Sequence, residues 1–210
     1  MKLIEKILSY MESENYEIFR LPGEKNIVYV EGMDKNGTIN SDKSNHFNDL
    51  RLVFAFDGVP PRKLRNGNAV IEGAWEGTTE PGYYYTDNPM NPKGAARIAF
   101  GQYQSWQIGI HGYSDPHEAL IQVGLVRVHR DYNRDMIRTG DAIDEGYFGI
   151  NQHWGHDHPI DDIHTASAGC LVGRTRVGHR AFMQLIKSDR RCVADPNFVF
   201  TTTIIPGNKL

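Results

Sequence analysis

Short apolar runs separated by glycine, proline and asparagine–glycine pairs recur along this chain, and they restrict its fold more than any other feature. Runs with the alternation or β-branched content of strands lie at Ile27–Val30, Arg51–Asp57, Ala69–Trp75, Leu120–Val128 and Phe198–Ile205. In the second run, Leu52, Phe54 and Phe56 fall on one face. Turn and link signals lie at Asn36-Gly37, Val59–Pro61 and Asn66-Gly67. The sequence therefore predicts a mostly β fold of the α+β class.

Two segments have helical spacing instead. The first lies near the N-terminus, and its apolar residues are Leu3, Ile4, Ile7, Leu8 and Met11. Charged residues lie between them, which predicts an amphipathic helix within residues 1–18. The second is His179–Arg190, whose apolar stripe is Phe182, Leu185 and Ile186. No repeat or linker divides the remainder, so we expect the helix of residues 1–18 to pack on, or be appended to, one domain over residues 19–210.

Composition excludes several classes of protein. The 210 residues are 40% hydrophobic and 23% charged, which is enough for one buried core. The formal net charge is -3 and the basic residues are scattered, so neither nucleic acid nor a membrane surface is an expected partner. No apolar run has the length of a membrane span, and the N-terminal run is too short and interrupted for a signal peptide. We therefore expect a protein that is cytoplasmic as synthesised.

A cysteine and a histidine, each beside a short apolar run, form a candidate catalytic pair. Cys170 follows a Ser-Ala-Gly triplet whose small side chains let the backbone turn sharply, and the N–H groups of Gly169 and Cys170 are a candidate oxyanion hole. His153 follows the strand-like run Tyr147–Asn151 and offers the base or cation that a thiol with a pKa of ~8.5 needs in order to ionise. The pair predicts a nucleophilic thiolate, whereas each residue taken singly is more often a buried cysteine or a satisfied histidine.

The sequence leaves some assignments open. His111, within Gly109-Ile110-His111-Gly112, is a second candidate for the base and otherwise a residue of the pocket wall. The group that orients His153 is one of Asp161, Asp162, His164 or a backbone carbonyl. Nothing in the spacing of Cys170 and Cys192 supports a disulfide, so we expect two free thiols.

The same segment resembles the L,D-transpeptidase-like cysteine enzymes of bacterial cell-wall metabolism. Their signature is a histidine with a glycine nearby, then a spacer, then Ser or Thr, any residue, Gly, Cys and an apolar residue. The matching positions here are His153, Gly155, Ser167, Gly169, Cys170 and Leu171. Similarity to the phage and prophage, endolysin-like branch of the family lies at Gly77–Gly82, Gly101–Tyr103, Arg130–Asn133 and Gly149–His153. The resemblance extends over residues 20–205.

The resemblance implies a fold and an activity. The fold is an L,D-transpeptidase-like β-sandwich or barrel with one helix at the N-terminus and another after the cysteine. The activity is cysteine-dependent acyl transfer on the stem peptides of bacterial peptidoglycan, through a thioester and without a cofactor. A wall-building enzyme must be exported, and no export signal is visible here. We therefore expect hydrolysis, as by a phage lysis protein that reaches the cell wall after release.

The resemblance also assigns roles to single residues. Cys170 is the nucleophile, His153 its base and later its acid, and Gly169 and Cys170 the oxyanion backbone, while Ser167 supports the turn. Substrate-binding positions are expected at His111, Trp154, Arg174 and Tyr103. The family commonly has a histidine where this chain has Ala168 and an arginine where it has Val172, and Arg174 is a candidate replacement for that arginine.

Three other functions are alternatives to hydrolysis. An L,D-transpeptidase would pass the thioester to an amine and so form or exchange crosslinks. The departures at Ala168 and Val172 are compatible with a non-catalytic wall-binding module. The spacing His153-x-x-His156-x-His158 is compatible with a zinc-dependent amidase or peptidase, although we expect no metal. Asp131-x-Asn133-x-Asp135 begins like a calcium loop but lacks its glycine and glutamate, so a polar turn is expected there.

Overall fold

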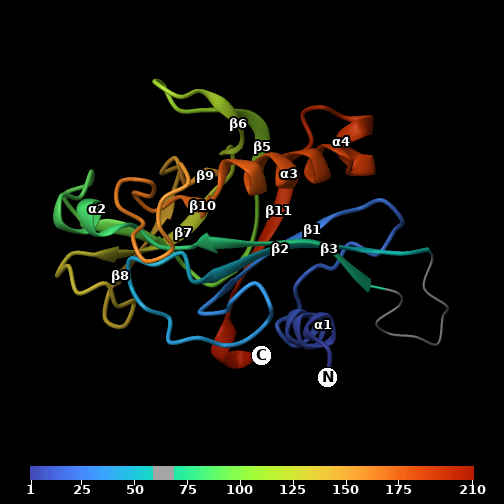
Figure 1. The fold of residues 1–210 in the computed structure, drawn as a ribbon, viewed down its shortest axis with the longest axis horizontal. Helices are drawn as coiled ribbons and strands as arrows, with labels where there is room; N and C mark the ends of the chain where they lie inside the picture. The colour runs from blue at the N-terminus through green and yellow to red at the C-terminus, as the bar shows by residue number, and fades with distance from the viewer. Residues whose placement is uncertain (59–68) are drawn as a thin grey trace.

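The computed structural model describes residues 1–58 and 69–210, and most of its secondary structure belongs to a closed barrel (Figure 1). The barrel strands are β1 (Asn26–Glu31), β2 (Asp49–Phe56), β3 (Ala69–Thr78), β5 (Gly101–His111), β6 (His117–Gln122), β9 (Gln152–Trp154), β10 (Leu171–Gly173) and β11 (Phe200–Pro206). Around the barrel they follow the order β1-β11-β5-β6-β9-β10-β3-β2. The expected α+β fold of mostly strands is confirmed.

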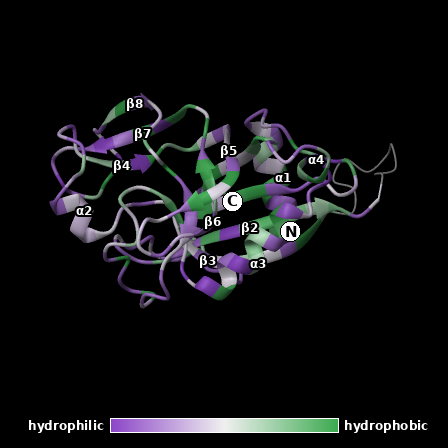
Figure 2. Ribbon diagram, turned by 90° about the horizontal axis from the view of Figure 1, so that it is seen from above, coloured by the Kyte–Doolittle hydropathy of each residue, from purple (hydrophilic) through white to green (hydrophobic). Residues whose placement is uncertain are grey.

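A second sheet lies beside the barrel. It has three strands in the order β4-β7-β8, namely β4 (Ala95–Ile98), β7 (Val126–Asp131) and β8 (Ala142–Gly146). The short helix α2 (Tyr83–Asp87) lies at the same end of the molecule, far from α1 (Leu3–Ser13) (Figure 2). The candidate cysteine and histidine lie on the two short strands of the barrel, or next to them, on the side that this sheet approaches (Figure 1).

Two apolar clusters hold the barrel together, one on each face of β2. Leu52, Phe54 and Phe56 pack with Ile7, Leu8 and Met11 of α1, so the predicted face of the strand and the predicted face of the helix meet each other. Val53 points the other way, into the larger cluster, which includes Trp106 and Phe182. Because both faces are covered, every residue of β2 is buried.

The remaining helices follow the cysteine segment. They are α3 (Arg176–Lys187), α4 (Arg190–Ala194) and the short 3-10 helix η1 (Gly207–Lys209). Helix α3 begins three residues earlier than His179 because the Thr175 side chain accepts a hydrogen bond from Gly178 N–H at 3.1 Å and caps it. No helix in the described part of the chain is long and apolar enough to cross a membrane.

The prediction of one strand over Leu120–Val128 is wrong. The run divides into β6 and β7, which belong to different sheets. Between them, the N–H groups of Val123 and Gly124 both donate to Ser105 O, which turns the chain away from the barrel. A side chain at Gly124 would place its Cβ 2.8 Å from Gln104 O, so only glycine allows this approach.

Other local predictions have mixed outcomes. Asn36-Gly37 is a turn, in which Gly37 has φ +85° and donates to Asp34 O. Residues Tyr147–Asn151 are not a strand, and the strand β9 begins only at Gln152. Val59–Pro61 and Asn66-Gly67 lie outside the described residues.

Candidate active site

The parallel pairing of β9 with β10 brings the candidate histidine and cysteine together. In this register His153 is the partner of Val172, and Cys170 lies two residues before Val172. Residues two apart on a strand point to the same face, and paired residues of neighbouring strands do so too. His153 and Cys170 therefore share one face of the barrel wall, while Leu171 points into the core.

The turn before Cys170 is held by Ser167. Its hydroxyl donates to Cys170 O at 2.9 Å and accepts from Gly169 N–H at 3.1 Å. The Gly169 N–H is thereby occupied, which is a correction to its expected share in an oxyanion hole. The Cys170 N–H makes no hydrogen bond to any residue that the structure describes, so it remains the available donor of this turn. Ser167 supports the turn as expected.

The thiol of Cys170 is surrounded by backbone. Its Sγ accepts a hydrogen bond from Asn151 N–H at 3.4 Å and donates one to Gly149 O at 3.4 Å. Burial raises the pKa of Cys170 to about 11, against the smaller lowering effect of the Asn151 N–H. Cys170 is thus a neutral thiol at neutral pH, and the expected thiolate is not supported. Cys170 and Cys192 are both free, as expected.

His153 is a buried, neutral imidazole with one defined tautomer. Its Nδ1 lies 2.8 Å from Trp154 O, and because a carbonyl only accepts, Nδ1 carries the proton. The other nitrogen, Nε2, then has a free lone pair and no hydrogen-bond partner in residues 1–58 and 69–210. Burial, and secondly the neighbouring His111, lower the pKa of His153 well below its ordinary value. The orienting group that the sequence left open is the Trp154 carbonyl.

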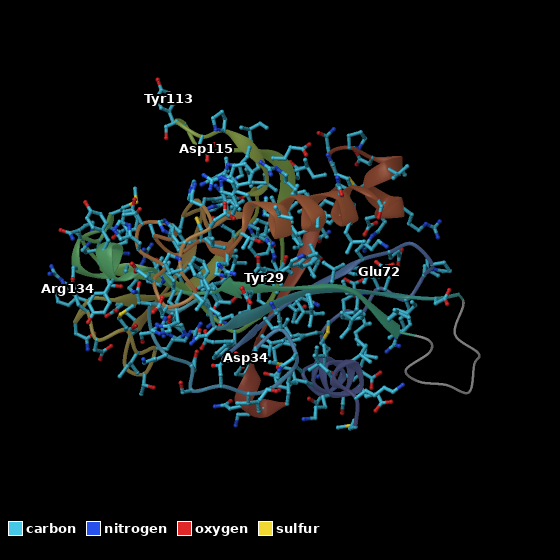
Figure 3. All side chains as sticks on the ribbon, in the orientation of Figure 1. Tyr29, Asp34, Glu72, Tyr113, Asp115 and Arg134 are labelled. Atoms are coloured by element: carbon cyan, nitrogen blue, oxygen red, sulfur yellow. The ribbon has the colours of Figure 1, made fainter. Side chains whose placement is uncertain are left out.

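His111 belongs to the same site. It is the last residue of β5, at the base of a β5–β6 hairpin whose tip, with Tyr113 and Asp115, projects from the body (Figure 3). Its ring stacks on that of His153 with centroids 3.9 Å apart and planes 12° apart. Burial, with a smaller contribution from His117, lowers the pKa of His111 to about 4. Two neutral imidazoles therefore lie face to face.

Asn151 determines the tautomer of His111. The Asn151 Oδ1 accepts from Gln122 N–H at 2.8 Å, which orients the amide so that Nδ2 donates to His111 Nδ1 at 3.0 Å. The lone pair of Nδ1 is thus occupied, and the proton of His111 is on Nε2. His111 is therefore arranged as a hydrogen-bond donor, whereas His153 is arranged as an acceptor. No sequence pattern predicts this role of Asn151.

These groups line one cavity of about 640 Å³. His111, His153 and Cys170 are on its wall, together with Arg130 of β7 and Phe148. Cavities of this size hold small ligands or a short stretch of peptide. The sequence pattern brought out the cysteine and the two histidines, but not the contribution of the second sheet.

Three expected substrate-binding residues are not among the described residues that line this cavity. The ring of Trp154 is stacked on His117 with centroids 3.7 Å apart, on the wall of a separate cavity. Arg174 pairs with Glu76 at 2.6 Å and donates to His158 O, so it holds the loop between β9 and β10. The hydroxyl of Tyr103 donates to Ala99 O. Their observed contacts are structural.

The histidine-rich loop after β9 shows no cluster of metal ligands among the described residues. Within the described ranges, no three or more His, Cys, Asp and Glu side chains are placed to hold a metal ion. His156 contacts Asp115 at 3.4 Å, while His158 and His164 lie against each other with ring centroids 5.6 Å apart. The geometry thus gives no support to the zinc alternative. The calcium-like segment is a turn, because the Asp131 carboxylate accepts from the N–H groups of Asp135 and Met136.

Comparison of the chain with protein-family models, curated proteins and solved structures finds no match.

Proposed function

We propose that the protein is a cysteine acyltransferase that attacks a peptide carbonyl and breaks its C–N bond through a thioester. The observation that carries the proposal is the tautomer of His153, which leaves Nε2 with a free lone pair on a residue that lines the same cavity as Cys170. A neutral thiol beside a neutral, oriented imidazole suits general-base catalysis, in which the proton moves as the bond forms. The occupied lone pair of His111 supports His153, rather than His111, as the base.

The proposed reaction has two halves. As Sγ of Cys170 attacks the carbonyl carbon, its proton moves to His153 Nε2 and the carbonyl oxygen becomes an oxyanion, for which Cys170 N–H is the available donor. The oxyanion then collapses and expels the amine, which takes the proton back from His153 and leaves a thioester. Water attacks the thioester while His153 accepts a proton from it. The C–S bond then breaks, the carboxylic acid is released, and His153 returns the proton to Sγ of Cys170.

The substrate proposed is the stem peptide of bacterial peptidoglycan, and the fold proposed is the L,D-transpeptidase-like fold. Both rest on the resemblance of the segment from His153 to Leu171 to that family. A barrel that carries the histidine on β9 and the cysteine directly before the parallel strand β10, followed by helix α3, supports that proposal. We propose hydrolysis rather than crosslinking as the reaction, and bacterial peptidoglycan as the partner.

The test is mass spectrometry of the soluble products from purified peptidoglycan. Wild-type protein and Cys170→Ala should bind the wall equally, but only the wild type should release shortened or separated stem peptides. Cys192→Ala is the matched control, because this second free thiol lies on α4, away from the cavity, and its removal should leave turnover intact.

Other results would point elsewhere. Products that carry an added amine acceptor would show transpeptidation, and a wall that is bound but never altered would show a binding module. Turnover that persists in Cys170→Ala but is lost with EDTA would overturn the cysteine mechanism in favour of a metal enzyme.

A further inference from the structure

Arg130 is a buried cation on the wall of the candidate active site with an unused donor. It lies on β7, is only 5% exposed, and borders the same cavity as Cys170. Its Nε donates to Asp144 at 3.2 Å, but its buried Nη2 has no hydrogen-bond partner within residues 1–58 and 69–210. A buried guanidinium N–H without a hydrogen bond lowers the stability of the folded protein unless a ligand accepts from it.

Arg51 and Arg191 also have buried guanidinium nitrogens without a hydrogen-bond partner, but neither lines this cavity, and two arginines of the same region are paired. Arg97 donates to Glu80, and Arg138 donates to Glu31, so each of these buried cations has its own carboxylate. Asp144, in contrast, is shared between Arg130 and Lys93. Two cations thus surround one anion, and the charge of Arg130 is only partly compensated.

The residues that line the cavity determine which charges a ligand meets beside Arg130. No aspartate or glutamate is among the described residues that line it. The pKa of His111 and that of His153 are both lowered, chiefly by burial, so these imidazoles add no positive charge at neutral pH. The Phe148 ring lies 4.4 Å from Cζ of Arg130 and holds the guanidinium plane in place. Among the described residues that line the cavity, Arg130 is the one arginine or lysine.

The second sheet places this group close to the nucleophile. Arg130 is the register partner of Ala96 on β4, and paired Cα atoms of antiparallel strands are about 5 Å apart. Ala96 in turn touches the cysteine turn, because a Cβ added to Gly169 would lie 2.3 Å from Ala96 O. Only one strand thus separates Arg130 from the loop that presents Cys170.

We propose that Arg130 binds a carboxylate of the acyl-donor substrate, so that substrates with a free carboxylate near the attacked carbonyl are preferred over their amides. A guanidinium offers a planar fork of N–H donors that matches the two oxygens of a carboxylate. Bound in this way, the carboxylate satisfies Nη2 and anchors the substrate beside the thiol. The inference rests on the proposed function, whose substrate it defines further.

The test uses reactive probes that need no turnover. Iodoacetyl-glycine, iodoacetyl-β-alanine and iodoacetyl-γ-aminobutyrate each carry a carboxylate at a different distance from the carbon that alkylates Cys170. Mass spectrometry measures the rate at which each acid, and its primary amide, alkylates Cys170. The protein carries Cys192→Ala so that Cys170 is its one thiol, and the same reagents react with glutathione as the free-thiol reference. At one spacing the acid should react about tenfold faster than its amide, relative to glutathione, which is the scale of a hydrogen bond to a charged group.

Variants connect the preference to Arg130. Arg130→Gln should reduce the acid-to-amide ratio to that of glutathione, and Arg130→Lys, which keeps the charge and the contact with Asp144 but not the fork, should give an intermediate ratio. Lys93→Gln is the matched control, because it removes the other cation on Asp144 from outside the cavity, and should keep the preference.

Two results would overturn the inference: no preference for the acid at any spacing, or a preference that is undiminished in Arg130→Gln. Since alkylation reports only on the cavity, these results are separate from a failure to cleave peptidoglycan, which the mass spectrometry of wall products detects.

Discussion

At the scale of single residues, the site is defined by which ring nitrogen of each histidine carries the proton. His153 and His111 are chemically alike and stacked, yet the Trp154 carbonyl and the Asn151 amide give them opposite tautomers. The sequence brings out both histidines, because each follows a similar Gly-Ile pattern, and the resemblance favours His153 as the base. It does not show the tautomer of either ring. The distinction depends on hydrogen bonds from other strands, and these are set by tertiary structure.

His153→Ala should lower acyl transfer by ~10² or more, the scale of general-base catalysis. The pH profile of Cys170 alkylation by iodoacetamide should hardly move, because burial raises the pKa of Cys170 to about 11 and the thiol is neutral with or without the imidazole. His111→Ala should impair turnover less, since the Nδ1 lone pair of His111 is already occupied. Turnover of both variants and their alkylation rates between pH 5 and pH 9 provide the measurement. A larger loss of turnover in His111→Ala would transfer the role of base to His111.

At the scale of elements, the strands that can be predicted are those with a local pattern. β1, β2, β3 and β11 follow from short β-branched or alternating runs, and α1 and α3 from helical spacing. The division of Leu120–Val128 into β6 and β7 was missed, because its apolar run is continuous and the turn depends on the distant Ser105 carbonyl. The second sheet, and with it the place of Arg130 on the cavity wall, is not predicted, because no local pattern shows which strands pair.

The cysteine turn makes a prediction at this scale. Gly169 has φ +125°, and an added Cβ would lie 2.3 Å from Ala96 O, so Gly169→Ala must displace backbone of the second sheet. We expect a loss of unfolding free energy of about 3 kcal/mol or more together with lost turnover. Gly140→Ala is the control, because Gly140 also has a positive φ, +95°, but no atom within 4 Å of the added Cβ. It should cost only about 1 kcal/mol. Chemical unfolding measures both, and equal losses would show that the contact with Ala96 is unimportant.

At the scale of the whole molecule, closure of the barrel brings together strands that are remote in sequence. β1 pairs in parallel with β11, and β10 pairs with both β9 and β3. Such pairings depend on contacts across the chain, and no local pattern reports them. They also bury titratable groups: His179 of α3 accepts from Arg51 Nη1 at 3.2 Å and lies 2.8 Å from Glu118 O. The stability of the barrel should therefore depend on pH.

The contribution of His179 to this dependence has a definite sign. Burial, and secondly Arg51, lower the pKa of His179 from 6.5 to about 3, so between these values the unfolded chain binds a proton that the folded protein does not. Its stabilising contribution is complete above the unfolded pKa and is lost as the pH falls towards 3. Between about pH 4 and pH 6 the expected loss is about 1.4 kcal/mol per pH unit.

His179→Gln isolates this contribution, because a glutamine amide can accept from Arg51 and donate to Glu118 O without titrating. Glu80 acts in the opposite direction, since burial raises its pKa to about 7, but it is present in both proteins and cancels in their difference. Urea unfolding of the two proteins from pH 4 to pH 7 gives the unfolding free energy of each as a function of pH. Below pH 6 the two slopes should differ by the binding of one proton, and above the unfolded pKa of histidine the slopes should become equal. Parallel curves throughout would mean that His179 titrates alike in the folded and unfolded protein, and the barrel would then owe none of its pH dependence to this imidazole.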